Sequence, residues 1–355
     1  MGEFRMPTLG SDMEAGTLVE WMKHPGDTVK KGDVIAVVDT QKGAIEIEVF
    51  EDGVLDRIVV APGTKVPVGT VLAQIRGTAP SPPAGTAPQE EPHRSRVSPM
   101  ARKVAADRGV DLALVKGSGA QGAITREDVE RAAAPASAMR TAIAAAMARS
   151  KREIPHYYLS TQVDMSAALT WLRAENEKRP MTDRLLPAVL LIKAVALGLR
   201  DVPELNGYWV DGGFRAGAGI HVGCAISLRG GGLVAPALHD ADQTDLTTLM
   251  RQLQDLVARA RAGSLKSSEL ADPTITVTNL GDQGVDAAFG IIYPPQVAIV
   301  GIGKIAERPW VVSGRIEPRP VLTATLSADH RASDGHRGGV FLAVVDRLLQ
   351  TPEAL

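Results

Sequence analysis

Residues 78–95 constrain the fold of this 355-residue chain more than any other stretch. They begin Thr-Ala-Pro-Ser-Pro-Pro-Ala-Gly and offer almost no apolar side chains, so they cannot bury a core. Their prolines favour extended backbone, and the stretch could span on the order of 60 Å at about 3.3 Å per residue. It is either disordered filler or a tether. Both interpretations make residues 1–77 a separate domain.

Composition narrows the class of protein. Apolar residues make up 45% of the chain and charged residues 23%, which is ordinary for a globular protein. The net charge of −2 gives no basic excess for binding nucleic acid. A single cysteine, Cys224, excludes a disulfide framework and a cysteine-based zinc site, and we predict no metal site. The longest apolar run, residues 185–199, is too short to span a bilayer, and the N-terminus lacks a signal core. We therefore expect a cytoplasmic protein that does not enter membranes.

Residues 1–77 are predicted to form an all-β domain. Short runs of strand-forming residues alternate with turns rich in glycine, proline and aspartate. The runs are Thr17–Met22, Val34–Val38, Ala44–Phe50, Val54–Val60 and Thr70–Ile75. Strands this short and evenly spaced favour a small sandwich or flattened barrel.

Lys42 lies between two of these strands, in Asp-Thr-Gln-Lys-Gly. An apolar run precedes it, and Ile45, Ile47 and Val49 alternate with glutamates after it, which predicts a hairpin with Lys42 at its tip. Most exposed lysines have no special role. A rigid hairpin tip would nevertheless suit a lysine that is modified and then carries a group.

Residues 96–132 are predicted to form a very small helical domain. Ser98-Pro99 begins one helix, which should end before Gly109, and Thr125-Arg-Glu-Asp128 is typical of a capping box that opens a second helix. The glycine-rich residues 117–122 follow no predicted strand and lack Gly-Lys-Ser/Thr, so they are not a phosphate-binding loop. Residues 133–138 are expected to be a short second linker.

Residues 139–355 mix helices and strands. We predict helices at Pro187–Leu199, Thr244–Arg261 and Gly338–Leu349, and strands at Thr274–Thr278, Gln296–Gly301 and Pro320–Ser327. His330 follows the last of these strands, in Ala-Asp-His-Arg-Ala-Ser-Asp-Gly. A histidine at a strand end can act as a general base near neutral pH, and Asp334 could orient the local structure or balance charge. His156, His221, His239 and His336 are assigned structural roles by default.

The three parts together resemble the dihydrolipoamide acyltransferases (E2) of 2-oxoacid dehydrogenase complexes. The first domain resembles a lipoyl domain in Met13-Glu-Ala-Gly-Thr, Pro25-Gly-Asp and Asp39-Thr-Gln-Lys-Gly43. The second resembles a peripheral subunit-binding domain. The third resembles an α/β catalytic domain like that of chloramphenicol acetyltransferases, in Thr276-Val-Thr-Asn-Leu-Gly281 and His330-x-x-x-Asp-Gly335.

The resemblance implies a role for each motif. Lys42 would carry lipoate, and Arg102 and Lys103 would dock partner subunits. His330 would take the proton from the thiol of coenzyme A, Thr278 would stabilise the oxyanion, and Asp334 would belong to the same motif. The implied partners are the thiamine-dependent dehydrogenase (E1) and dihydrolipoamide dehydrogenase (E3).

The resemblance also implies that the base and the hydroxyl come from neighbouring subunits of a homotrimer. Relatives that build large cages usually continue past such an ending, whereas this sequence stops at Pro352-Glu-Ala-Leu355. The resemblance therefore implies a discrete trimer or a weakened higher assembly. Two alternatives are a non-catalytic lipoyl-bearing scaffold and a biotin carrier fused to a transferase. The second is disfavoured because Lys42 lacks flanking methionines. The sequence does not indicate which acyl group is transferred. Two segments, 186–188 and 281–283, differ from the sequence usual in the family.

Overall fold

The computed structural model describes residues 2–7, 15–40, 43–76, 97–108, 112, 115, 117–119, 123–228 and 232–355. Most of residues 1–143 form one compact unit and most of residues 144–355 form a second. In the described part of the chain, no helix is both long and apolar enough to cross a bilayer.

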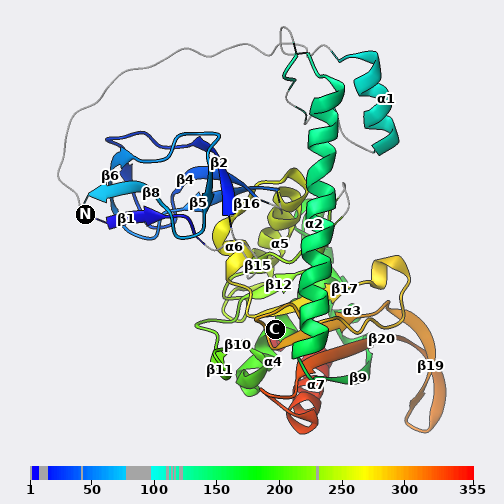
Figure 1. The fold of residues 1–355 in the computed structure, drawn as a ribbon. Coiled ribbons are helices and arrows are strands. Elements are labelled where there is room, and N and C mark those ends of the chain that lie inside the picture. Colours follow the sequence, from blue (N-terminus) through cyan, green and yellow to red (C-terminus); the bar gives the residue numbers. More distant parts are fainter. Residues whose placement is uncertain are drawn as a thin grey trace. The chain divides into compact units, whose positions relative to one another are not determined.

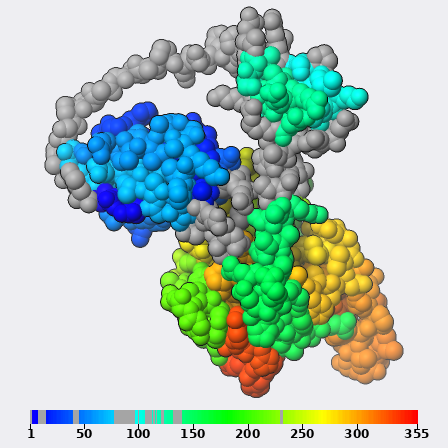
Figure 2. Space-filling view, viewed as in Figure 1, coloured from blue at the N-terminus to red at the C-terminus, as the bar shows by residue number. Residues whose placement is uncertain are grey.

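The N-terminal part is all-β, as predicted (Figure 1). One sheet has the order β1-β8-β6-β3, from Gly2–Arg5, Val71–Arg76, Gly53–Ile58 and Thr28–Val29. The other contains β5-β4-β2-β7, from Gly43–Glu48, Val34–Thr40, Ala15–Trp21 and Lys65–Pro67. Alternate residues such as Leu18, Ile35, Ile47 and Leu72 are fully buried in one core, which makes a flattened barrel. In the space-filling view this part (blue) has a closed, rounded surface (Figure 2).

The two strands of the predicted hairpin around Lys42 are present and pair with each other. β4 pairs antiparallel with β5, and the last described pair joins Thr40 to Gly43. Gln41 and Lys42 lie between these residues and outside the described part of the chain.

The small helical part has the predicted helix starts. The helix α1 spans Pro99–Arg108, and the hydroxyl of Ser98 accepts a hydrogen bond from the Ala101 amide at 3.1 Å. The helix α2 begins at Arg126 with a reciprocal cap, because Asp128 accepts the Thr125 amide at 2.9 Å and the Thr125 hydroxyl accepts the Asp128 amide at 3.3 Å. Five buried side chains form the core: Ala101, Ala105, Val115, Ile124 and Val129.

The second linker is a correction to the sequence analysis. The helix α2 continues from Arg126 to Glu153, so residues 133–138 are helical and do not form an irregular linker. This stretch is mostly alanine, the residue with the highest helix propensity, and that preference outweighs the single proline at position 135.

The C-terminal part is built on a mixed sheet with the order β15-β12-β17-β18-β20-β19. These strands are Ala237–Leu238, Val222–Cys224, Ile275–Asn279, Ala298–Ile302, Arg315–Asp329 and Ala306–Val312. The strands β12, β17 and β18 run parallel to one another, and β20 runs antiparallel to β18. The strand β9 (His156–Asp164) pairs with the second half of β20.

Helices pack on this sheet and against one another. They are α3 (Ser166–Glu177), α4 (Pro187–Asp201), α5 (Leu246–Ala262), α6 (Ser267–Ala271) and α7 (Gly335–Gln350). The helices α4 and α7 touch closely at Gly198, where an added Cβ would lie 3.2 Å from the ring of Phe341. Asp245 caps α5, which begins at Leu246 instead of the predicted Thr244, and Gly263 ends the helix with a φ of 75°.

The strand β20 is longer than predicted. We expected a strand at Pro320–Ser327. It begins at Arg315 and forms a long hairpin with β19, in which Pro309 faces Pro318. This hairpin (orange) projects from the rest of the C-terminal part (Figures 1 and 2). The remaining strands are short: β10 (Gly207–Val210), β11 (Gly213–Ala216), β13 (Ile226–Ser227), β14 (Leu233–Val234) and β16 (Leu265–Lys266).

Candidate active site

His330 lies directly after the last residue of β20, as predicted. Its amide donates to the carbonyl of Pro155 at 3.0 Å, and its side chain is exposed. The amides of Ala332 and Ser333 both donate to the Asp329 carbonyl, at 3.0 and 3.1 Å, so the chain turns sharply after His330. The turn therefore presents the imidazole at the end of an interior strand of the sheet.

An ion pair anchors the two residues that flank His330. Asp329 is fully buried, and its carboxylate accepts hydrogen bonds from the Arg331 side chain, among them one from Nε at 2.9 Å and one from Nη2 at 2.7 Å. The Arg331 guanidinium lies 4.8 Å from the ring centre of Trp209, a cation–π contact. Sequence reasoning missed this pair. The opposite charges on either side of the candidate base were the available signal.

Asp334 caps the helix α7. Its carboxylate accepts the amide of Arg337 at 2.9 Å. The hydrogen bond from the Arg337 amide, with further help from the His336 amide and the charges of His336 and His330, lowers the pKa of Asp334. Its observed contact is therefore with the helix start, which agrees with the predicted local orienting role.

The three threonines of the segment 274–278 differ sharply in their surroundings. The Thr274 hydroxyl bonds to Asn206 Oδ1 and the Thr276 hydroxyl donates to Gln296 Oε1 at 2.7 Å, and both threonines are buried. Thr278 is half-buried, and its hydroxyl has no hydrogen-bond partner among the residues that the structure describes. A free hydroxyl on a rigid strand is available to a ligand.

One chain does not bring Thr278 and His330 together. Thr278 pairs with Gly301, Gly301 pairs with Thr325, and His330 lies five residues beyond Thr325, just past the end of β20. At about 3.3 Å per residue and about 4.8 Å between strands, the two residues are roughly 19 Å apart, at opposite ends of the sheet.

His156 has the structural role that we assigned to it. Its Nε2 accepts the amide of Ile292 at 3.1 Å, which places the ring proton on Nδ1, where it faces the carbonyl of Ile154 at 2.9 Å. Burial lowers the pKa of His156, so the ring stays neutral near pH 7. His221 and His239 are also engaged, since His221 Nδ1 accepts the Asp240 amide and His239 Nε2 lies 2.9 Å from Asp272.

An apolar cavity of about 370 Å³ lies between α4, α5 and the strands β12, β17 and β18. The two segments that differ from the usual family sequence, 186–188 and 281–283, both contribute to its lining, through Leu186, Ala188 and Asp282. Cys224 also lines it, and burial raises the pKa of that thiol to about 12, so it is not a nucleophile at neutral pH. No cluster of metal ligands occurs in the described ranges.

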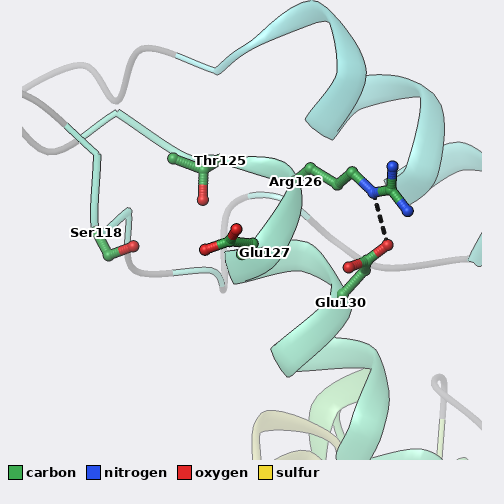
Figure 3. A pocket seen from close by; sticks show the side chains of 5 residues that line it. All are labelled: Ser118, Thr125, Arg126, Glu127 and Glu130. Carbon is green, nitrogen blue, oxygen red and sulfur yellow. Dashed lines mark hydrogen bonds and ion pairs between the residues drawn. The ribbon is translucent and has the colours of Figure 1, made fainter.

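The candidate docking side chains are exposed on the small helical part. Arg102 and Lys103 lie on the outer face of α1. Beside the start of α2, Ser118, Thr125, Arg126, Glu127 and Glu130 line an open hollow (Figure 3). There Arg126 is paired with Glu130 at 2.7 Å.

An exposed histidine at one end of the sheet and a free hydroxyl at its other end are the two groups that an acyl-transfer site needs. Comparison with known proteins specifies the class. Residues 129–355 match the family model for 2-oxoacid dehydrogenases acyltransferase (catalytic domain), residues 2–75 match that for biotin-requiring enzyme, and residues 95–130 match the E3 binding domain. The chain belongs to the 2-oxoacid dehydrogenase acyltransferase family.

Curated relatives resemble the whole chain. The dihydrolipoyllysine-residue acetyltransferase component of the pyruvate dehydrogenase complex of Rhizobium meliloti is 31% identical, over 98% of both chains. The protein of the same name from Rickettsia bellii is 30% identical, over 98% of this chain and 97% of its own.

Solved structures resemble the C-terminal part. A probable dihydrolipoamide acetyltransferase of Listeria monocytogenes has a TM-score of 0.57 and 32% identity, over 60% of this chain and 91% of its own. The Azotobacter vinelandii dihydrolipoamide acetyltransferase has a TM-score of 0.57 and 27% identity, over 61% and 90%. That structure was solved to study a serine, a histidine and an asparagine in the catalytic mechanism.

Proposed function

We propose that this chain passes an acyl group from a lipoyl-lysine to coenzyme A within a 2-oxoacid dehydrogenase complex. The observation that carries the proposal is the contrast between Thr278, whose hydroxyl is free, and Thr274 and Thr276, whose hydroxyls are bonded. The serine, histidine and asparagine of the Azotobacter enzyme have the same spacing along that chain as Thr278, His330 and Asp334 have here. A scaffold without activity would leave the hydroxyl and the exposed histidine without a use.

The transfer needs one base and one oxyanion donor. His330 takes the thiol proton of coenzyme A, because a thiol with a pKa near 8.5 is a weak nucleophile until deprotonated. The sulfur attacks the thioester carbonyl, and the Thr278 hydroxyl donates to the oxyanion that forms. The carbon–sulfur bond to the dihydrolipoyl group then breaks, and His330 returns the proton to the departing sulfur.

The carrier would be Lys42. Its hairpin fits this role, because paired strands hold the chain rigidly up to Thr40 and from Gly43, and Asp39 is already exposed. Lipoate in amide linkage to Lys42 supplies a sulfur that carries the acyl group as a thioester. We propose residues 1–77 as the lipoyl domain, 96–132 as the docking domain for the E1 and E3 subunits through Arg102 and Lys103, and 139–355 as the catalytic domain. The names of the curated relatives support acetyl as the first acyl group to test.

We further propose that the catalytic unit is a homotrimer in the cytoplasm. Because His330 and Thr278 lie at opposite ends of one sheet, a complete site needs His330 from one subunit and Thr278 from the next. The free, buried thiol of Cys224 suits a reducing compartment.

The first test is transfer of acetyl from acetyl-dihydrolipoamide to coenzyme A by wild type and His330→Ala. Loss of a general base should lower kcat by roughly 10²–10⁴-fold. Equal rates for the two proteins would refute the enzymatic proposal.

A second test examines the shared site. His330→Ala and Thr278→Ala chains are mixed under conditions that exchange subunits. In mixed trimers, the Thr278→Ala chain supplies an intact His330 and the His330→Ala chain supplies an intact Thr278. Where these two residues meet at a subunit interface the site is complete, so activity should rise well above that of either variant alone. Activity equal to the mean of the unmixed variants would show that each site lies within a single chain.

A further inference from the structure

Tyr157 contacts both ends of the turn that carries His330. It lies on β9 beside the end of β20, where it pairs with Ala328. Its ring meets the imidazole of His330 edge-on, with centroids 5.4 Å apart and planes at 72°. Its hydroxyl shares a hydrogen bond of 2.9 Å with the Ser333 hydroxyl. One side chain therefore contacts the candidate base and a residue three positions further along the turn.

The first turn of α7 confines Tyr157. A Cβ at Gly338 would lie 2.9 Å from the Tyr157 hydroxyl oxygen and 2.8 Å from Leu159. A larger residue there would push the phenol away from its partners. Burial, with smaller effects from Asp334 and Glu204, raises the pKa of Tyr157, so the phenol stays neutral and does not exchange protons with His330 near pH 7.

The imidazole of His330 has little else to orient it. Its backbone is fixed by Pro155 and by the Asp329–Arg331 pair, but its exposed ring has no side-chain hydrogen bond to any described residue. The imidazole ring instead makes an edge-on contact with the ring of Tyr157. Aromatic pairs of this geometry are attractive, because the positive edge of one ring meets the negative face of the other.

We propose that Tyr157 is a positioning residue for acyl transfer: its ring sets the orientation of His330, and its bond to Ser333 holds the turn. This inference rests on the proposed role of His330 as the base. A misplacement of about 1 Å at a reacting group can cost on the order of 10²-fold in rate. A residue that acts only through orientation should therefore affect kcat and leave KM for coenzyme A unchanged.

The test compares Tyr157→Leu, which removes the ring, with Tyr157→Phe, which keeps the ring and removes the hydroxyl. In the full-length, lipoylated chain, Tyr157→Leu should lower kcat by about 10- to 100-fold at constant KM. Tyr157→Phe should keep most of the wild-type kcat. Ser333→Ala should match Tyr157→Phe, and the double variant should be no worse than either single variant, because all three remove the same bond.

Tyr158→Leu is the matched control. Tyr158 is the next residue of β9, and its ring packs on His156 and Phe289 instead of His330. Its kcat should stay within about twofold of wild type. Sedimentation and thermal unfolding of every variant show whether the trimer and the fold persist.

The outcomes separate this inference from the proposed function. If His330→Ala is inactive while Tyr157→Leu keeps the wild-type kcat, the positioning role is wrong and the proposed function stands. If Tyr157→Leu loses stability and raises KM together with lowering kcat, its role is structural and the inference is also wrong. If His330→Ala remains active, the proposed function itself fails.

Discussion

At the scale of single residues, the proposed function rests on which threonine hydroxyl is left without a partner. Thr274, Thr276 and Thr278 share one face of the same strand segment, and their side chains are identical. The first two complete buried hydrogen bonds, whereas Thr278 comes near the end of the strand, where burial decreases. The same residue type thus stabilises the fold at two positions and is available for chemistry at the third.

Thr278→Val and Thr276→Val should therefore affect different properties, the first activity and the second stability. Thr278→Val removes an oxyanion donor and should lower kcat by about 10²–10³-fold with little change in stability. Thr276→Val leaves the buried oxygen of Gln296 without its donor and should lower the free energy of unfolding by about 1–3 kcal/mol. Steady-state kinetics and chemical denaturation measure both. A catalytic loss in Thr276→Val as large as that in Thr278→Val would contradict this assignment.

At the scale of secondary structure, helix starts hold both candidate functional regions in place. Asp334 caps α7 four residues after His330, and Asp128 caps α2 in the small helical part. In each case a carboxylate accepts amides that the helix cannot pair internally.

Substitution of Asp334 should depend on whether the cap survives. Asparagine caps helices as well as aspartate does, so Asp334→Asn should keep the melting temperature and most of the activity. Asp334→Ala should lower the melting temperature by about 2–4 °C and lower kcat, because the turn that presents His330 loosens. Scanning calorimetry and kinetics on the same preparations test this. Equal behaviour of the two variants would show that capping is not what Asp334 contributes.

The small helical part should be sensitive to acid. Hydrogen bonds from the Ser118 hydroxyl, the Ser118 amide and Thr125 hold the pKa of Asp128 well below its usual value. Because the pKa is lower in the folded state than in the unfolded state, this carboxylate stabilises the fold fully above the unfolded pKa, and the contribution is lost as pH falls below about 4. Methyl NMR signals of Ile124 and Val129 should therefore report unfolding on acidification. In Asp128→Asn, the signals should show a weaker fold at pH 7 and a smaller dependence on pH.

At the scale of the whole molecule, the chain combines a carrier, a docking domain and a transferase. Deleting residues 81–92 should lower turnover of the assembled complex severalfold, because the carrier domain reaches fewer sites. Transfer from free acyl-dihydrolipoamide should be unaffected. Lys42→Arg serves as the control, since it should lack the lipoyl increment in the intact mass and abolish only the coupled reaction. If the turnover of the assembled complex is unchanged after the deletion, the linker does not contribute to the reach of the carrier domain.

Much of this organisation is readable from the sequence. The cap at Thr125, the start of α1 at Pro99 and the histidine after β20 are local features, set by residues within a few positions of one another. The helical course of residues 133–138 and the early start of β20 differ from the prediction. The first follows from alanine propensity and the second from pairing with β19.

The sequence by itself determined which residues are candidates for the chemistry: His330 follows a strand, Thr278 lies on another, and Lys42 lies between two strands that pair. Only the tertiary structure decided how these strands are ordered, which threonine hydroxyl stays free and which tyrosine contacts His330. The reason is that sheet order and side-chain contacts join residues far apart in the chain. The roughly 19 Å between Thr278 and His330 follows from the pairing of β17, β18 and β20, and no local pattern records it.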